Sequence, residues 1–498
     1  MKSVTDSKRP NLLLITVDQM RHDCLSILGH PIVETPNLDE LARTGVRFEH
    51  AYSATPTCVP ARAAIFTGLK QTSHGRVGYQ ERVPWNYPTT LPGELSKSGY
   101  HTQCVGKMHV YPARSLLGFH NVVLHDGYLH YNRNKHDTAV QEHYDEVDDY
   151  LQWLRGQAPG ADLLDLGLDC NASTVARPWA LPEHLHPTNW TVSQSIDFLR
   201  RRDPGKPFFL WMSFVRPHSP LDPPQAYLDL YKDADFPDPV IGEWALKEDP
   251  DGNGFNPVTS KGMVPKRRLR MAMAAYYALI THIDHQIGRF LQALNEYGER
   301  NNTIIMFTSD HGELLGDHHM YRKSLPYEGS AHIPFIVNDL GGHLDTLPGS
   351  IVPEVIELRD IMPSLLDAAA TEIPGSVEGH SIWDLARAPK EYNLNKPWRE
   401  YLHGEHAQGA ASTQWITNGK EKYIWYSQTG EEQFFDLAQD PSEMHNLIFH
   451  PAMQERIQHW RSVLIRELAG REEGYVEDDC LITGREPVSI LSHIFQSD

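Results

Sequence analysis

The sequence predicts an α/β protein in which helices sandwich a large mixed, mostly parallel sheet, followed by a smaller α+β subdomain with an antiparallel sheet. In the first part of the chain, apolar runs of strand length alternate with segments of helical periodicity, as in sheets covered on both faces. Beyond about residue 385, short strands are separated by turn sequences instead. We therefore divide the chain into a large α/β domain, residues 1–384, and a C-terminal subdomain, residues 385–498.

The strands expected in the large domain are near-continuous apolar runs, rich in β-branched and aromatic residues. Such runs are typical of strands that are buried on both faces of a parallel sheet. They cover residues 12–17, 102–105, 208–215, 303–308 and 334–337.

Helical periodicity appears between these runs, and the longest helix is expected at about residues 268–297. Shorter helices are predicted at residues 38–44, 91–98, 189–201 and 358–370. In the C-terminal subdomain we predict strands at 413–417, 422–426 and 433–437 and a helix near 453–468. Asn418-Gly419, between the first two of these strands, is a strong hairpin signal.

The composition limits the partners that the protein can bind. The chain has 65 acidic and 45 basic residues, a formal net charge of −20. Such a surface repels nucleic acid and long polyanions, so an anionic ligand must be met by a local basic cluster. The five cysteines are odd in number and widely spaced, which argues against a disulfide framework and a structural zinc site.

The N-terminal segment is interpreted as a buried first strand. Its apolar stretch is short and ends at Asp18, so it predicts neither a secretory signal nor a membrane span. We therefore expect a cytoplasmic protein without nucleic-acid or membrane partners, and we leave its oligomeric state open.

Reactive polar residues follow four of the predicted strands. They are Asp18 and Gln19, Lys107 and His109, His218, and Asp310 and His311. Because open α/β sheets place their ligand crevice outside the carboxyl ends of the strands, we expect these side chains to gather at one edge. Any one of them could be an ordinary strand end, but four together favour a functional site.

Asp18, Gln19, Asp310 and His311 form a candidate metal set. Three oxygen donors favour a hard cation, Ca²⁺ or Mg²⁺, and the imidazole also admits Mn²⁺. The alternative for residues 310–312 is a simple turn, since Asp and Gly favour turns.

Two long segments, residues 120–150 and 231–265, are predicted to leave the sheet and form walls or lids of the site. The first contains five histidines whose spacing fits no standard metal site. They are His120, His125, His130, His136 and His143. We interpret them as polar loop residues.

The segment Cys58-Val59-Pro60-Ala61-Arg62, followed by small residues and Thr67-Gly68, carries the most specific signal. This Cys-x-Pro-x-Arg motif resembles the signature of the type I sulfatases in the alkaline phosphatase superfamily. Asp18-Gln19 is similar to the family's first metal motif, and residues 309–312, Ser-Asp-His-Gly, are similar to its second.

Three further motifs occur in the family's order. Residues 106–109, Gly-Lys-Met-His, resemble its Gly-Lys-x-His motif, and residues 217–220, Pro-His-Ser-Pro, resemble its Pro-His-x-Pro motif. Lys323, before Tyr327-Glu328-Gly329, resembles the lysine that precedes the family's Tyr-Glu-Gly. The resemblance covers about residues 10–340 and continues weakly into the C-terminal subdomain.

The resemblance implies a sulfuric ester hydrolase in which a maturation enzyme oxidises Cys58 to formylglycine, whose hydrate is the nucleophile. It also implies that Cys58 in this form joins the metal set, with Ca²⁺ as the expected ion. By the same resemblance, Arg62 and Lys107 bind the nucleophile and the sulfate, His109 is the base for the second hydroxyl, and His218 and Lys323 protonate the leaving oxygen.

Gln19 and His311 depart from the Asp-Asp and Asp-Asn pairs that many sulfatases carry; the imidazole broadens the choice of ion, and the departure opens an alternative function. Phosphonate monoester and phosphodiester hydrolases of the superfamily use the same nucleophile. A third hypothesis, from another class, is a non-catalytic protein that binds sulfated ligands and keeps Cys58 as a thiol.

The expected substrate is a small or terminal sulfated sugar or an aryl sulfate, because the acidic surface disfavours long polyanions. Glu405, His406 and Gln414 are candidates for substrate contacts from the C-terminal subdomain.

Overall fold

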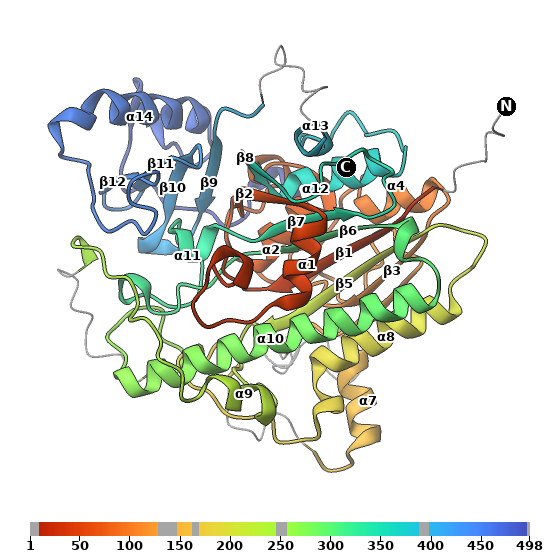
Figure 1. The fold of residues 1–498 in the computed structure, drawn as a ribbon. Coiled ribbons are helices and arrows are strands. Elements are labelled where there is room, and N and C mark those ends of the chain that lie inside the picture. The colour runs from red at the N-terminus through yellow and green to blue at the C-terminus, as the bar shows by residue number, and fades with distance from the viewer. Residues whose placement is uncertain (1–8, 128–146, 162–168, 246–255, 388–397, 496–498) are drawn as a thin grey trace.

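An eight-stranded sheet forms the centre of the computed structural model, which describes residues 9–127, 147–161, 169–245, 256–387 and 398–495 (Figure 1). Its strand order is β4-β3-β5-β1-β6-β7-β2-β8. The strands are β1 (Asn11–Asp18), β2 (Val46–Tyr52), β3 (His101–Gly106), β4 (Asn121–Leu124), β5 (Phe208–Pro217), β6 (Thr303–Ser309), β7 (Phe335–Asp339) and β8 (Ser350–Glu357). Within the described residues, only β7 runs antiparallel to its neighbours, which confirms the predicted mixed, mostly parallel sheet.

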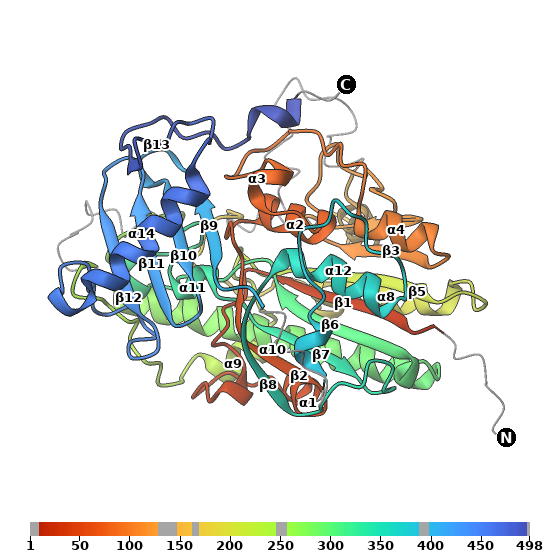
Figure 2. The same ribbon diagram turned by 90° about the horizontal axis from the view of Figure 1, so that it is seen from above.

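Helices cover both faces of this sheet because its strands are apolar on both sides. Leu13 and Ile15 of β1 pack into one core, whereas Leu12 and Leu14 pack into the other, as the period of two requires. The first core is covered by α1 (Pro36–Thr44), α8 (Pro187–Arg201), α9 (Gln225–Tyr231) and α10 (Lys266–Glu296). The second is covered by α2 (Cys58–Thr67), α4 (Leu91–Lys97) and α12 (Ile361–Ala368), as Figure 2 shows from above.

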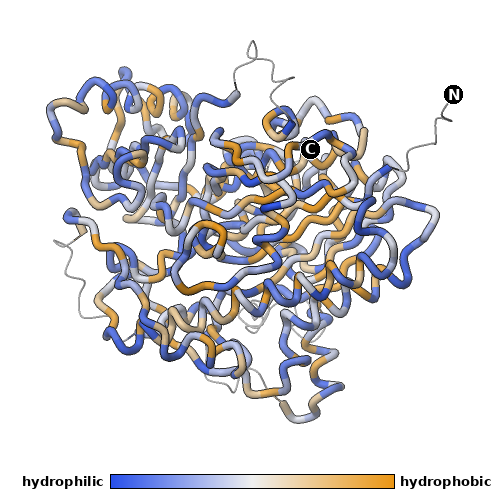
Figure 3. Tube along the Cα trace, in the orientation of Figure 1, coloured by the Kyte–Doolittle hydropathy of each residue, from blue (hydrophilic) through white to orange (hydrophobic). Residues whose placement is uncertain are grey.

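The hydropathy of the chain follows these layers. Figure 3 shows apolar residues concentrated in the central strands and polar residues on the outer loops and helix faces. The described part also contains the short helices α3 (Gln71–His74), α7 (Asp149–Gln157), α11 (Glu328–Ala331) and α13 (Trp383–Ala386). No helix in these ranges is both long and apolar enough to cross a bilayer.

A second, antiparallel sheet with the order β12-β11-β10-β9 forms the C-terminal unit. It consists of β9 (Leu402–His406), β10 (Thr413–Thr417), β11 (Glu421–Tyr426) and β12 (Glu432–Asp436). Helix α14 (Gln454–Leu468) packs on one face, and the other face packs on Tyr52 and Tyr327 of the large unit. A small hairpin, β13 (Val476–Glu477) and β14 (Cys480–Leu481), follows α14.

The chain end returns from this unit to the large one. Val77 N donates to Ser489 O at 3.0 Å, and Leu491 N donates to Gly75 O at 2.8 Å. Ala407, just after β9, donates to Val77 O at 2.8 Å. Residues 75–78 are thus joined on two sides to the C-terminal part of the chain.

All the predicted strands and helices are present within a few residues of their predicted ends, but six strands of the described residues were missed: β2, β4, β8, β9 and the short β13 and β14. The division at residue 384/385 stays a prediction, because residues 388–397 lie outside the described part. The prediction that residues 120–150 leave the sheet is wrong at its start, because residues 121–124 form β4 and pair with β3. Most of the remaining predicted walls stays a prediction, since residues 128–146, with His130, His136 and His143, and residues 246–255 are not described.

Candidate active site

The carboxyl ends of four neighbouring strands meet at one edge of the sheet. Val17 of β1 is in register with Ser309 of β6 and Phe214 of β5, and Val105 of β3 is in register with Met212 of β5. The residues that follow these positions therefore emerge side by side, as the strand-end argument predicted.

Two glycines allow the close backbone approaches on which this edge depends. A Cβ on Gly106 would lie 1.9 Å from Ser213 O, and a Cβ on Gly312 would lie 2.0 Å from Gly329 O. Lys107 N donates to Ser213 O at 2.9 Å, directly after Gly106. A side chain at either glycine would push apart segments that position site residues.

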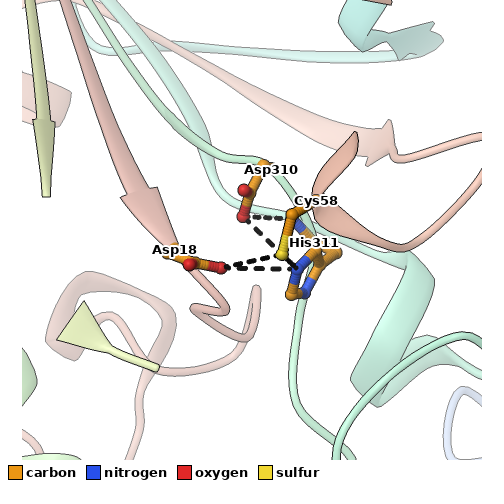
Figure 4. A group of neighbouring side chains, drawn as sticks. All are labelled: Asp18, Cys58, Asp310 and His311. Carbon is orange, nitrogen blue, oxygen red and sulfur yellow. Dashed lines mark hydrogen bonds and ion pairs between the residues drawn. The ribbon is translucent and has the colours of Figure 1, made fainter. Parts of the chain in front are cut away.

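Asp18, Cys58, Asp310 and His311 come together in a buried cluster (Figure 4). One ligand atom from each side chain lies within 4.8 Å of those of the other three. Cys58 Sγ is 3.2 Å from His311 Nε2 and 3.7 Å from Asp18 Oδ1. Residues from Asp18 to His311, which are 293 positions apart in the chain, thus surround one small volume.

Cys58 is the first residue of α2, where unpaired backbone N–H groups favour a negative charge. Burial and Asp18 raise the pKa of the Cys58 thiol, but Lys107, Lys323 and His311 outweigh them, so that its pKa is well below the ordinary value. The surroundings of Cys58 therefore favour an anion at this position.

The two site lysines contact Cys58 from different elements. Lys107 Nζ donates to Asp18 Oδ2 and lies 3.6 Å from Cys58 Sγ. Lys323 Nζ lies 3.3 Å from the same sulfur and donates to Gln19 Oε1 at 2.9 Å. Burial lowers the pKa of Lys107, but Asp18 and Cys58 raise it more, so its ammonium stays charged.

Arg62 is fully buried one helical turn after Cys58 and holds a neighbouring carboxylate. Its Nε donates to Asp310 Oδ2 at 3.1 Å, and its Nη1 donates to Lys107 O and Ser213 Oγ at 2.7 and 3.0 Å. Its Nη2 has no hydrogen-bond partner within the described residues. The direct contact of Arg62 with the nucleophile's oxygens stays a prediction.

His109 follows β3 with a left-handed backbone, φ 58°, which is uncommon for a residue with a side chain. Asp126 holds this turn by accepting from Met108 N at 2.7 Å and from His109 N at 3.0 Å. The imidazole Nε2 lies 2.9 Å from Glu81 Oε1.

His218 lies beside the cluster at the end of β5. Its backbone N–H donates to Asp18 O at 3.1 Å, and its Nδ1 lies 2.9 Å from Ser219 O. Because a carbonyl only accepts, this bond assigns the proton to Nδ1 and leaves Nε2 as an acceptor. Burial, followed by Lys323, lowers the pKa of His218 well below its ordinary value.

Gln19 adjoins the cluster, with φ 74°. Its backbone N–H donates to Asp310 Oδ1 at 3.2 Å, and its side-chain Nε2 donates to Glu313 Oε2. Its amide oxygen accepts from Lys323. Gln19 as a metal ligand stays a prediction.

The donor set fits a divalent cation. Asp18 and Asp310 are both fully buried, and burial together with the charge of Asp18 raises the pKa of Asp310. Two carboxylates and an imidazole around one volume match hard or intermediate ions, Ca²⁺, Mg²⁺ or Mn²⁺. A cation bound there would offset the repulsion between the two carboxylates.

A cavity of about 730 Å³ opens above Cys58. Its floor includes Lys107, His109, His218 and Lys323, so the structure brings these predicted residues together. The C-terminal part of the chain supplies a wall through residues 406–409, Pro487 and Ser489.

The three candidates from the C-terminal subdomain differ in position. His406 lines the cavity, whereas Glu405 is buried and pairs with Arg471 and Gln414, both at 2.9 Å. Neither Glu405 nor Gln414 is among the residues that line this cavity.

The sequence argument missed three acidic residues that hold the site. Glu81 contacts the His109 ring, Asp126 holds the turn at His109, and Glu313 accepts from the Gln19 side chain. Asp126 follows β4, so the strand-end argument could have found it had this four-residue strand been recognised. Glu81 and Glu313 lie in irregular segments that have no periodic signal.

Comparisons with known proteins agree with this geometry. Residues 10–371 match the sulfatase family model, and residues 316–469 match that of the N-sulphoglucosamine sulphohydrolase C-terminal region. The chain is 56% identical over 487 residues to an arylsulfatase of Clostridium perfringens, covering 98% of this chain and 100% of that protein.

Two further proteins are similar to this chain over most of its length. The chain is 29% identical to the multifunctional alkaline phosphatase superfamily protein PehA of Trinickia caryophylli, over 89% of this chain and 92% of that protein. The phosphonate monoester hydrolase of Agrobacterium radiobacter has a similar structure, with a TM-score of 0.74, 26% identity, and coverage of 92% of this chain and 95% of that one.

The fold and the buried cluster thus define a hydrolase of the alkaline phosphatase superfamily. Within that superfamily, the chain belongs to the sulfatase family. The resemblance stated from the motifs is confirmed, and the protein is an enzyme of the sulfuric ester hydrolase class.

Proposed function

We propose that this enzyme hydrolyses the sulfate ester of a small or terminal sulfated sugar, or of an aryl sulfate, with a nucleophile made from Cys58. The observation that carries the proposal is the convergence of Lys107 Nζ, Lys323 Nζ and His311 Nε2 on Cys58 Sγ, at 3.6, 3.3 and 3.2 Å. A sulfate ester is an anion, so cations at this point offset the repulsion that an attacking oxygen would meet. The similarity to an arylsulfatase supports the same reaction class.

The proposed nucleophile requires a maturation enzyme that supplies a two-electron oxidant and converts the CH₂–SH group of Cys58 to the aldehyde of formylglycine, with release of the sulfur as sulfide. Its hydrate would supply two hydroxyls on one carbon, one to attack sulfur and one whose deprotonation later expels sulfate. Cys58 is 2% exposed at the base of the cavity, so we expect its oxidation before folding is complete.

Asp18, Gln19, Asp310 and His311 are the proposed ligands of a Ca²⁺, Mg²⁺ or Mn²⁺ ion. When bound, such an ion would polarise a sulfuryl oxygen and favour the deprotonated nucleophile. Arg62 orients Asp310 through its Nε, and Lys107 orients Asp18, so both carboxylates are fixed without substrate.

Proton transfer is assigned to two residues that line the cavity. We assign His109 as the base for the second hydroxyl, with Glu81 at 2.9 Å to hold its ring. Lys323 is the ammonium nearest to Cys58 Sγ and is assigned the proton for the leaving oxygen. Acid–base help of this kind contributes about 10²–10⁴-fold to the rate. The acid role expected for His218 is not assigned, because its pKa is lowered and its Nδ1 proton is bound to Ser219 O.

A second candidate, hydrolysis of phosphonate monoesters or phosphodiesters, is favoured by the structural similarity to a phosphonate monoester hydrolase. The deciding experiment compares kcat/KM for para-nitrophenyl sulfate, para-nitrophenyl phenylphosphonate and bis(para-nitrophenyl) phosphate. We expect the sulfate to be the best substrate and the Cys58→Ala variant to be inactive. A higher kcat/KM for either phosphorus ester would reverse the assignment.

Two further points concern the location in the cell and the hypothesis of a non-catalytic protein that binds sulfated ligands. No disulfide joins the cysteines of the described residues, which supports the proposed cytoplasmic location. The non-catalytic alternative is contradicted by the sulfatase family match and by the 56% identity to an arylsulfatase.

A further inference from the structure

The cavity extends beyond the groups that surround Cys58 and has two arginines, Arg82 and Arg322, in its lining. The chain as a whole carries a formal net charge of −20, so positive side chains in one cavity create a local field selective for anions. Lys107 and Lys323 contact Cys58, so in the proposed reaction both lysines bind the sulfate ester group. Arg322 adds positive charge that a single sulfate does not require, while Glu81 in the same lining is held by His109.

Arg322 is the better defined of the two. Its Nη2 donates to Asn171 Oδ1 at 2.8 Å, and Asn171, an uncharged residue, also lines the cavity. Within the described ranges, no carboxylate lies at ion-pair distance from its guanidinium, whereas Arg62 and Arg216 are paired with Asp310 and Asp222. No carboxylate in those ranges therefore offsets the guanidinium charge, and the planar N–H donors other than the one that binds Asn171 can bind a ligand.

The backbone fixes the position of this arginine. Arg322 and Ser324 have φ values of 69° and 85°, in the left-handed region that disfavours residues with a Cβ. Arg322 N donates to Glu313 Oε1, Leu314 N donates to Arg322 O at 2.8 Å, and Ser324 N donates to Pro56 O at 3.0 Å. Such strain persists where a segment is held on both sides, and it clusters at functional sites.

The same segment places Arg322 next to Lys323, and both side chains line one cavity. Lys323 marks the ester end through its contact with Cys58. The Arg322 side chain is hydrogen-bonded to Asn171 and lines the same cavity, so it is a candidate for contact with the alcohol part of the ester. A cavity of about 730 Å³ has room for an alcohol larger than a single aromatic ring.

We propose that Arg322 is a specificity-determining residue that binds a second oxyanion on the alcohol part of the substrate. The preferred substrate is then a doubly anionic ester, such as a sulfated sugar that also carries a carboxylate or a second sulfate. This inference rests on the proposed function and adds the chemical class of the alcohol to it. A guanidinium binds either oxyanion through paired N–H donors.

The test uses the matured full-length enzyme and four probes. They are para-nitrophenyl sulfate, its derivatives with a carboxylate ortho or meta to the ester, and nitrocatechol disulfate. For each dianionic probe, kcat/KM is divided by kcat/KM for para-nitrophenyl sulfate, and this ratio is compared between the wild type and variants. The ratio cancels effects of the variants on the ester group itself.

In Arg322→Gln, we expect the ratio for at least one dianionic probe to fall by about 10–100-fold, the usual value of a hydrogen bond to a charged group. Arg322→Lys keeps the charge but loses the planar donors, so it should recover part of the ratio. Arg267→Gln, an exposed residue at the start of α10, controls for the loss of one positive charge and should leave the ratio within about twofold.

One result would overturn the inference while leaving the proposed function intact: a ratio that Arg322→Gln does not change for any of the three dianionic probes. If kcat/KM itself then falls equally on all four probes, Arg322 has a role at the ester or in folding. If the wild type hydrolyses none of the sulfates, the proposed function itself fails. The probe that responds, carboxylate or sulfate, identifies the second oxyanion.

Discussion

Cys58 depends on charges that other elements hold in place. The thiol is buried beside Asp18, which disfavours an anion, yet Lys107 and Lys323 reverse that preference from opposite parts of the chain. The same lysines would face the oxygens of a sulfate ester. The site is therefore selective for charge before any substrate enters.

The cation site makes a prediction about Asp310. Replacing Asp310 with Asn removes a buried carboxylate charge that Arg62 orients. This carboxylate lies beside Asp18 and His311, the other two proposed ligands in the cluster. We expect the affinity for Ca²⁺, Mg²⁺ or Mn²⁺, whichever binds the chelator-treated wild type most tightly, to fall at least about tenfold. Isothermal titration calorimetry measures this without reference to activity.

Asp284→Asn is the control for that experiment because Asp284 lies on α10, away from the cluster, and should bind metal like the wild type. Equal metal affinity of Asp310→Asn and the wild type would exclude Asp310 as a ligand.

The residues of the site were predictable to different degrees. Asp18, Lys107, His218 and Asp310 each follow an apolar strand, so periodicity and the geometry of parallel sheets were sufficient. Glu81 reaches His109 from an irregular segment whose position depends on residues 75–78 being held by the C-terminal part of the chain. Such long-range packing has no local sequence pattern.

Among the elements, the long apolar strands and amphipathic helices were predictable, whereas polar or short strands were not. β2 alternates buried residues with Arg47 and Glu49, and β8 contains Pro353, which an edge strand tolerates. β9 is mostly polar, and Gly404 lies against the ring of Trp415. These strands form because of partners elsewhere in the sheet, not because of local propensity.

Helix α1 depends on a cap from another helix. Thr35 makes no side-chain cap, and Asp284 of α10 instead accepts from Asn37 N at 3.2 Å and Leu38 N at 2.8 Å. Asp284→Ala should lower the free energy of unfolding by about 2 kcal/mol, because buried N–H groups lose their acceptor. Denaturant unfolding measures this change.

Asp284→Asn keeps one acceptor oxygen and should cost less than the alanine variant. Both variants should retain the wild-type kcat/KM when fully folded, since Asp284 does not line the cavity above Cys58. Equal stability of Asp284→Ala and the wild type would contradict the capping role.

For the whole molecule, the junction between the two sheets makes stability depend on pH. Lys422 Nζ on β11 donates to Glu328 Oε1 at 2.7 Å and to Glu443 Oε1 at 2.8 Å; Lys422 and Glu443 are buried, and Glu328 is partly buried. Burial and the neighbouring Glu328 raise the pKa of Glu443 to about 7, although Lys422 opposes the shift. The folded protein therefore holds a proton on Glu443 that the unfolded chain releases near its ordinary pKa of 4.5.

The sign of the effect follows from proton linkage. Because the folded state binds the extra proton, this stability is fully present below the unfolded pKa and is lost as the pH rises through 7. Glu443→Gln, which mimics the protonated carboxyl, should remove the dependence. The unfolding free energy of the wild type minus that of the variant should fall by about 2–3 kcal/mol between about pH 5 and pH 8.

Glu405→Gln is the matched control. Burial raises the pKa of Glu405, but Arg471 and its other partners lower it more. The stability that Glu405 contributes is therefore fully present above its ordinary pKa of 4.5 and does not change between about pH 5 and pH 8. The difference between the wild type and Glu405→Gln should stay level over the same range. A level difference for Glu443→Gln would contradict the proton assignment at the junction.

The central claim is that Cys58, which lies within the cluster, is converted to the nucleophile. Mass spectrometry of the peptide that contains Cys58 tests this claim most directly. Protein from the native host, digested and sequenced by fragmentation, should carry the mass of an aldehyde in place of the thiol at Cys58, and not at Cys104. The same sample should hydrolyse para-nitrophenyl sulfate. A fully active sample in which Cys58 remains an unmodified thiol would contradict the account.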